Sequence, residues 1–207
     1  MARAVLIGVV AVAAVVPLFA QMAAPEAPLP GVPDSSRVTA GTYRVDPYHT
    51  QVVWTVNHMG FTPLSGDLAA SGGSLELDPA RPETARVSVT FGMATMTTLV
   101  PSFTTHLLSA DLFDVARHPT AQFTSTRVSV EGGQAKIVGD LTIRGVTRPV
   151  TLEARLFGAG FHPRNGKLNV GFSATARIRR SDFGINYAPT VGDEVDLRIH
   201  AAFEKVE

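Results

Sequence analysis

From Gly41 onward, apolar and polar residues alternate with a period of two, which predicts β-strands that have one apolar face. The clearest runs are Arg86–Met93, 137–143, 150–156, Lys167–Arg180 and Glu194–Glu204. Turn-forming residues separate them, as at Asn165-Gly166 and Gly192-Asp193. About eight strands of this kind predict an all-β fold, and their length and even alternation favour one antiparallel β-barrel over a sandwich.

One segment, Thr97–Val115, departs from this pattern. Its large apolar residues recur at intervals of four and mark an apolar helix face: Leu99, Phe103, Leu107, Leu108 and Leu112. Pro101 is compatible with the first turn of such a helix. A single apolar helix among strands must cover an apolar surface, so we expect a short helical lid over the barrel opening, sealed by this face and Phe113.

The N-terminus has the pattern of a signal peptide in residues 1–20. Arg3 supplies the positive charge, and the apolar run that ends at Pro17 is shorter than the roughly 20 residues of a spanning helix. Cleavage after Ala20 predicts an exported protein, periplasmic or secreted; an uncleaved anchor is the alternative. Residues 21–40, rich in Pro and Ala, predict a linker, and residues 41–207 predict the single folded domain.

Composition and motifs exclude several classes of function. The formal charge is zero, with 18 basic and 18 acidic residues, which argues against a nucleic-acid partner. The absence of cysteine excludes disulfides, thiol catalysis and cysteine-based metal sites. The sequence has no Gly-x-Ser-x-Gly elbow and no His-Glu-x-x-His motif, and its six histidines are not at tight metal-binding spacing. We therefore predict neither an enzyme nor a metal site.

His58 is the polar residue whose position is most informative. It shares one strand face with Trp54 and Val56, so its side chain should point into the barrel. There it either binds a quinone carbonyl or phosphate, or donates to a neighbouring backbone carbonyl. His49 is an odd number of residues away, and we expect it to stabilise the turn at Asp46-Pro47 instead.

Several arginines could donate to an anionic head group: Arg144, Arg148, Arg177, Arg179 and Arg180. Arg177 and Arg179 alternate with the apolar face of their strand, which predicts that they face solvent. Arg144 follows a strand and precedes Gly145, so a place at the rim makes it the best candidate.

Three stretches resemble the YceI-like family of exported lipid-binding proteins. Residues 43–60 contain the pattern Tyr-x-hydrophobic-Asp-x-x-His-Thr and a second His just before Gly. Residues 106–114 are similar to the family's His-Leu-x-Ser-x-Asp-Phe-Phe-Asp, and residues 139–150 to its Gly-x-Leu-Thr-x-x-Gly-Val-Thr-[Lys/Arg]-Pro-Val. Thr104-Thr105 replaces a usual charged residue, and Arg144 stands where His is common, so the head group accepted is open.

The resemblance implies an extended lipocalin-like barrel with a short helical insert. It also implies a long isoprenoid-type lipid, a polyprenyl phosphate or a quinone, in an apolar interior, and no other cofactor. We expect a periplasmic carrier, buffer or stress-related sensor with transient membrane contact; family members are often homodimers. The alternatives are a structural or interaction module whose barrel is filled by its own side chains, and an enzyme that modifies lipids through His58 and His106.

Inward-facing strand residues, the lid and the rim supply the residues that we predict to contact the ligand. They are Trp54, Val56, His58, Phe61, Val89, Phe91, Met93, Phe103, Leu107, Leu108, Leu112, Phe113, Phe123, Leu141, Ile143, Arg144 and Phe172.

Overall fold

The computed structural model describes residues 27–206. The expected signal peptide and the first part of the expected linker lie outside these residues. In the part of the chain that is described, no helix is long and apolar enough to cross a membrane.

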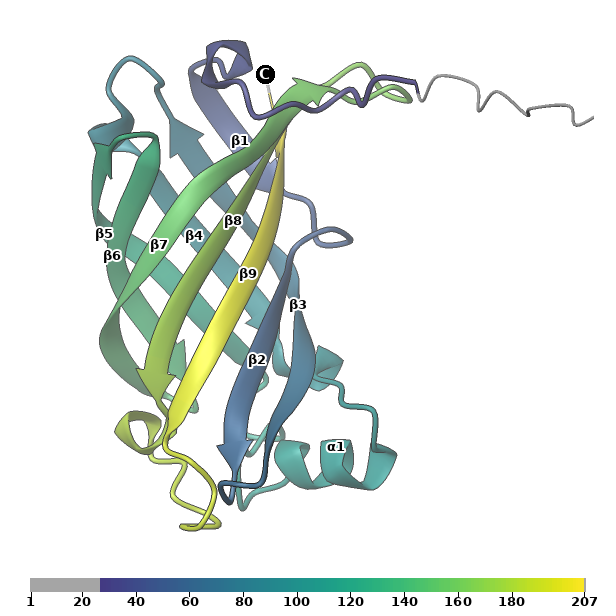
Figure 1. The fold of residues 1–207 in the computed structure, drawn as a ribbon, viewed down its shortest axis with the longest axis vertical. Coiled ribbons are helices and arrows are strands. Elements are labelled where there is room, and N and C mark those ends of the chain that lie inside the picture. Colours follow the sequence, from purple (N-terminus) through teal and green to yellow (C-terminus); the bar gives the residue numbers. More distant parts are fainter. Residues whose placement is uncertain (1–26, 207) are drawn as a thin grey trace, which may run out of the picture.

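Within residues 27–206, nine antiparallel strands form one closed sheet (Figure 1). They are β1 (Gly41–Val45), β2 (Gln51–His58), β3 (Thr62–Leu77), β4 (Arg86–Gly92), β5 (Thr120–Glu131), β6 (Gln134–Ile143), β7 (Val146–Phe161), β8 (Leu168–Arg179) and β9 (Glu194–Lys205). From β2 to β9 each strand pairs with the next one along the chain, and β9 pairs with β2. This pairing closes the ring and confirms the predicted antiparallel barrel.

Strands β1 and β2 together occupy one position in the wall, so the ring has eight positions. Both pair with β3 on one side and with β9 on the other. The five residues between them loop outward. Asp46 accepts a hydrogen bond from the backbone N–H of Tyr48 at 2.9 Å and lies 2.6 Å from Nδ1 of His49. The predicted role of Asp46 and His49 in this turn is therefore confirmed.

The helix is much shorter than the sequence pattern predicts. Helix α1 spans Pro101–Leu108, and Leu99 precedes it with a fully exposed side chain, so the expectation for Leu99 was wrong. Pro101 starts the helix because its missing N–H costs nothing in the first turn. At the other end, the hydroxyl of Ser109 donates to the carbonyl of His106 at 2.7 Å, and the chain leaves the helix in a series of turns.

Four short 3-10 helices complete the part of the fold that the structure describes. They are η1 (Ser35–Arg37), η2 (Pro82–Thr84), η3 (Met93–Thr95) and η4 (Arg180–Phe183). Helix η1 lies in the expected linker, and the last part of this linker packs against the barrel. Val32 forms a β-bridge with Ala159 of β7, and Val38 is buried in the core. The folded unit therefore begins before Gly41, where the alternating pattern starts.

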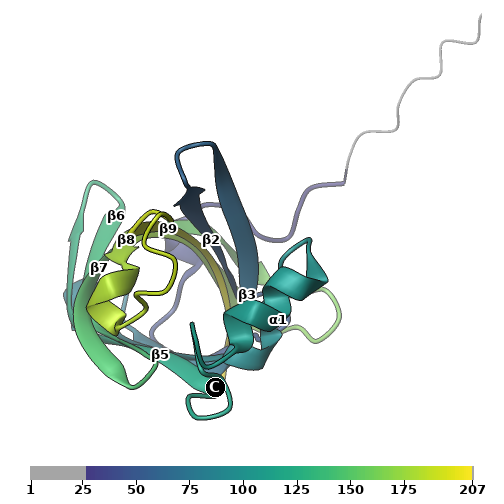
Figure 2. The same cartoon turned by 90° about the horizontal axis from the view of Figure 1, so that it is seen from below.

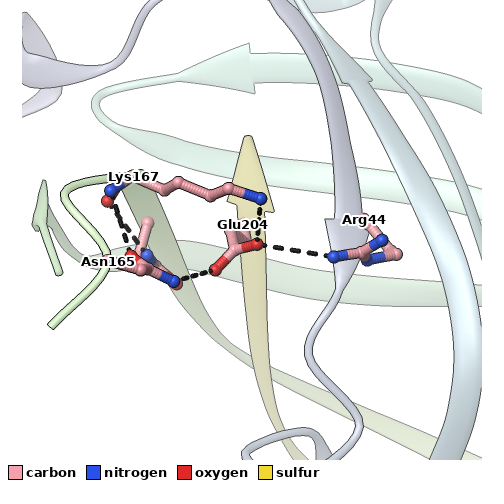
Figure 3. Close-up of polar contacts among 5 residues, drawn as sticks. Arg44, Asn165, Lys167 and Glu204 are labelled. Atoms are coloured by element: carbon pink, nitrogen blue, oxygen red, sulfur yellow. Dashed lines mark hydrogen bonds and ion pairs between the residues drawn. The ribbon is translucent and has the colours of Figure 1, made fainter. Parts of the chain in front are cut away.

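A polar cluster connects three elements at the end of the barrel opposite α1 (Figure 3). Glu204 on β9 accepts hydrogen bonds from Lys167 at 2.9 Å, from Asn165 at 2.7 Å and from Arg44 of β1 at 3.4 Å. The hydrogen bond from Lys167 is the main cause that lowers the pKa of Glu204 below its ordinary value. This cluster links β1 and the β7–β8 turn to the last strand.

Candidate ligand-binding site

The barrel encloses a cavity of about 650 Å³. This volume lies within the range of sites that hold one organic ligand, about 300–1,000 Å³. Every strand except β1 contributes side chains to its wall, and the wall extends from Val38 at one end to Met59 and Tyr187 at the other. The interior is thus a cavity that runs between the two ends of the barrel.

Small side chains on two neighbouring strands help to explain why the interior is not filled. Ala154 of β7 faces Ala174 of β8, which in turn faces Ile199 of β9, and all three line the cavity. The inward-facing side chains of Leu197 and Ile199 are only half-buried. In a close-packed core these positions would be fully covered, so the wall surrounds open space.

Two glycines allow large aromatic rings to lie against the wall. Gly66 faces Trp54 across β2 and β3, and a Cβ atom at Gly66 would overlap the indole ring. A Cβ atom at Gly139 would lie 2.5 Å from Cζ of Phe123. Both rings therefore cover a glycine in the neighbouring strand, which leaves the centre of the barrel open.

All but three of the residues predicted to contact a ligand line this cavity. His58 is among them and shares the inward face of β2 with Trp54 and Val56, as the alternation predicts. Their contact with a ligand stays a prediction, but the structure brings them together around one space.

Phe61, Leu108 and Arg144 do not line the cavity, and their contact with a ligand stays a prediction. Phe61 lies in the β2–β3 turn with 87% of its surface exposed. Leu108 packs against the outer part of the core. Arg144 donates to the carbonyls of Gly184 at 2.7 Å and Ala110 at 3.1 Å, so its guanidinium connects two loops. Alternation and loop position alone do not distinguish these roles.

Helix α1 lies at one end of the barrel, beside the ends of β2 and β3 (Figures 1 and 2). Phe103, His106 and Leu107 of the helix line the cavity, and so do Leu112 and Phe113, which follow it. The predicted lid residues thus face the interior from a helix and from the turns after it.

Three polar side chains of the wall lie at this α1 end. His58, His106 and Tyr187 all line the cavity here. The rings of His106 and Tyr187 contact edge to face, with centroids 4.9 Å apart, and Nε2 of His106 lies 3.7 Å from Oδ2 of Asp111. Imidazole and phenol groups both donate and accept hydrogen bonds, so they can bind a carbonyl or phosphate oxygen.

Arg180 has a structural role at the same end. Its guanidinium donates five hydrogen bonds of 2.7–3.0 Å to backbone carbonyls of the loop 185–192. Five is the full donor capacity of an arginine, so this side chain holds the loop and has no donor left for an anion. Arg177 is exposed and pairs with Asp196 at 2.6 Å and Glu194 at 3.4 Å, as expected for a solvent-facing residue.

One donor of the wall lacks a partner. The indole Nε1 of Trp54 is buried and has no hydrogen-bond partner among the residues that the structure describes. A buried donor without a partner costs about 1–3 kcal/mol. Trp54 is also the one tryptophan of the sequence, so its fluorescence reports directly on the cavity.

The sequence pattern missed residues that line the cavity from outside the strands. At the end opposite α1 these are Ser35, Val38, Pro79, Pro82 and Ala85; at the α1 end they are Phe183, Ile185, Tyr187, Ala188 and Val191. They lie in loops and 3-10 helices, where apolar residues have no periodicity. The one available signal is that residues 183–192 are uncharged although they lie in a turn region.

Comparison with known proteins gives consistent matches. A family model described as the YceI-like domain matches residues 43–203. Protein YceI of Escherichia coli O157:H7 is 38% identical over 164 residues, which cover 77% of this chain and 85% of that protein.

Solved structures show the same fold. The crystal structure of Burkholderia cenocepacia BcnA superposes with a TM-score of 0.63 at 23% identity, covering 76% of this chain and 98% of that one. A polyisoprenoid binding domain from Saccharophagus degradans superposes with a TM-score of 0.56 at 11% identity, covering 79% and 98%.

Proposed function

This chain belongs to the YceI-like family, and from that premise we propose that its barrel binds one long-chain isoprenoid-type lipid, a polyprenyl phosphate or a quinone. The observation that carries the proposal is the cavity of about 650 Å³, whose wall is almost entirely aliphatic and aromatic. A hydrocarbon chain can contact the apolar side chains of this wall without desolvating polar groups of the protein. The fold shared with a polyisoprenoid binding domain supports the choice of ligand class.

The dimensions of the barrel fit a long chain. A strand of 12 residues, such as β8, is about 40 Å long, and a tilt of about 40° leaves a barrel about 30 Å tall. That height is similar to the thickness of the hydrocarbon core of a membrane, about 30 Å. A tail that extends along the barrel can therefore be covered over most of its length.

The polar end of the ligand belongs at the α1 end in this proposal. His58, His106 and Tyr187 line the cavity there and supply hydrogen-bonding groups. Arg180 contributes no free donor, since its guanidinium is saturated by carbonyls. Hydrogen-bonding groups of this kind suit the oxygen of a quinone carbonyl or of a phosphate.

A carrier or buffer role follows from the energetics of transfer. Covering one five-carbon isoprene unit is worth roughly 4 kcal/mol relative to water. A membrane already solvates the tail, so the net free energy of transfer from bilayer to barrel is small and the lipid can be released again. The signal-like pattern of residues 1–20 supports a periplasmic or secreted location, in which lipids need a protein to cross water.

The cavity argues against the alternative of a barrel filled by its own side chains. Among the residues described, no group of three or more His, Asp or Glu side chains is placed to hold a metal ion. The residues at the α1 end therefore support binding as the first hypothesis, ahead of lipid modification.

Organic extraction and mass spectrometry of the purified protein test this function. We expect a long-chain lipid in the native protein and at least tenfold less in Ala174→Phe, because one added ring can fill the space left by a buried small side chain. Ala174 lies in the wall of the cavity at the middle of β8.

Thr175→Phe is the matched control, because Thr175 is the next residue on β8 and its side chain is exposed. It should retain the native lipid content. Equal lipid content in both variants, or no lipid in the native protein, would overturn the proposed function.

A further inference from the structure

Large apolar side chains are exposed around the α1 end of the barrel. Phe61 is 87% exposed, Leu99 is fully exposed, and Met59, Val100 and Tyr187 are about half exposed. We name these five residues the apolar rim. Met59 and Phe61 belong to the β2–β3 turn, Leu99 and Val100 precede α1, and Tyr187 lies in the loop after η4, so three separate segments contribute.

All three segments lie at the α1 end of the barrel, and the segment before α1 reaches the helix from the side away from the barrel (Figures 1 and 2). The backbone N–H of Gly192 donates to the carbonyl of Asn57 at 2.8 Å, which joins the loop after η4 to the end of β2. Asp67 and Thr97 form a β-bridge, which joins β3 to the segment before α1. The contact between the His106 and Tyr187 rings joins α1 to the loop. The rim is therefore a connected structure at the mouth of the cavity.

The rim segments are also free of formal charge. Residues 57–66, 87–110 and 183–192 contain no Asp, Glu, Lys or Arg, although charged residues make up 17% of the sequence. Desolvation of a charged group in a membrane is costly, and these segments avoid that cost. Apolar tips on segments that carry no charge can enter the boundary between head groups and acyl chains.

We infer that the apolar rim docks the barrel mouth onto the surface of an uncharged phospholipid bilayer. This inference rests on the proposed function and specifies how the lipid reaches the cavity. Met59 and Tyr187 belong both to the rim and to the cavity wall, so the exposed apolar surface adjoins the interior. A tail that leaves the bilayer at the rim can therefore pass from these side chains to the apolar wall.

A bilayer fits this surface better than a protein partner. The tips come from three separate segments arranged around the opening of a cavity, and a protein seated on them would close the path of the ligand. Because the rim carries no basic residue, docking should depend little on anionic lipid. Binding that requires anionic vesicles would therefore contradict the inference.

Transfer kinetics test the inference. The protein, expressed from its complete sequence, is mixed with phosphatidylcholine vesicles that contain a long-chain ubiquinone, and quenching of Trp54 fluorescence follows uptake. The double variant Phe61→Ser, Leu99→Ser should take up quinone about tenfold more slowly, since it removes two large apolar side chains from the docked surface. Neither residue lines the cavity.

The control variant is Tyr48→Ser, Phe157→Ser, which removes two similarly exposed aromatic side chains from the β1–β2 loop and from β7. It should keep the native transfer rate within about twofold, since surface substitutions away from a contact have small effects. An unchanged rate in the rim variant, or equal slowing in the control, would overturn the inference.

A second measurement separates this inference from the proposed function. Quinone is supplied in detergent micelles, and equilibrium quenching of Trp54 is compared between the native protein and the rim variant. Equal saturation in both, together with slow uptake from vesicles in the rim variant, supports docking. If the native protein shows no saturable quenching by quinone and extraction recovers no lipid, the proposed function itself is wrong.

Discussion

The two ends of the barrel close in different ways. At the α1 end, the three segments 57–66, 87–110 and 183–192 contain no charged residue, and Arg180 holds the loop 185–192 through its backbone carbonyls. At the opposite end, charged side chains join the elements, with Glu204 bound to Lys167, Asn165 and Arg44 (Figure 3). The segment around Val38 also packs into the wall there. The α1 end presents apolar side chains, and at the opposite end ion pairs and hydrogen bonds hold the elements together.

The difference between the two ends explains how a barrel with one cavity can exchange its ligand at one end only. A closed ring of strands has no preferred mouth, since its hydrogen-bonded ladder is the same at both ends. The loops therefore decide which end exchanges ligand. Loops held by an internal arginine can stay uncharged on their outer surface, whereas ion pairs on the outside would hinder contact with a bilayer.

The largest effect is expected from Arg180→Met. The variant removes five hydrogen bonds to the loop 185–192. Hydrogen bonds from a charged group are worth about 1.5–3 kcal/mol each, but water replaces most of them once the loop is released, so we expect a loss of about 3 kcal/mol in the free energy of unfolding. Denaturant unfolding followed by Trp54 fluorescence measures this loss.

Arg179→Met is the matched control, because Arg179 is the preceding residue and its side chain faces solvent. It should change the free energy of unfolding by less than about 0.5 kcal/mol. Similar losses in both variants would show that Arg180 has no special place in the α1 end.

A smaller loss is expected from Gly66→Ala, in the half of the barrel that contains the Trp54 ring. The added Cβ atom would overlap this ring and approach the carbonyl of Thr97, so the wall must move by a few tenths of an ångström or more. Overpacking of this kind costs about 2 kcal/mol. Calorimetry gives the loss, and the emission wavelength of Trp54 should shift as the ring is displaced.

Gly72→Ala on the same strand provides the comparison, since a Cβ atom at Gly72 has no atom within 4 Å. We expect this variant to have the free energy of unfolding and the tryptophan emission wavelength of the native protein. If Gly66→Ala behaves in the same way, the aromatic ring does not depend on the glycine beneath it.

The smallest effect concerns the charged end and its dependence on pH. The pKa of Glu204 is lowered, first by the hydrogen bond from Lys167. The folded state thus favours the carboxylate, and this contribution is present above the ordinary pKa of a glutamate, about 4.3, and is lost as the pH falls below it. The difference in unfolding free energy between the native protein and Glu204→Gln should therefore shrink from pH 6 to about pH 3. A difference that stays constant over this range would contradict the role given to the carboxylate.

The strands and the inward face were predictable because alternation with a period of two follows directly from strand geometry. His58 could be placed in the cavity for the same reason. The ends of the helix could not be predicted from the sequence, because Leu99 fits a helical spacing but precedes Pro101, where the helix begins. Spacing shows which residues could share a face, and local hydrogen bonds decide where the helix starts and stops.

The roles of the arginines and the size of the cavity lay beyond the sequence pattern. Arg144 and Arg180 resemble candidates for binding an anion until their partners are known. Those partners are backbone carbonyls of loops, up to 40 residues away along the chain for Arg144. Likewise, a strand with one apolar face has the same sequence pattern in a filled barrel and in a hollow one, so the pattern does not predict the cavity. The difference lies in the register that brings Ala154, Ala174 and Ile199 side by side.

The most direct measurement is a crystal structure of the protein purified without removal of bound lipid. We expect elongated electron density for one lipid inside the barrel, with the polar end of the lipid near His58 and His106 and its tail directed toward Val38. Inward side chains packed against one another across the axis, with no density for a chain between them, would contradict it.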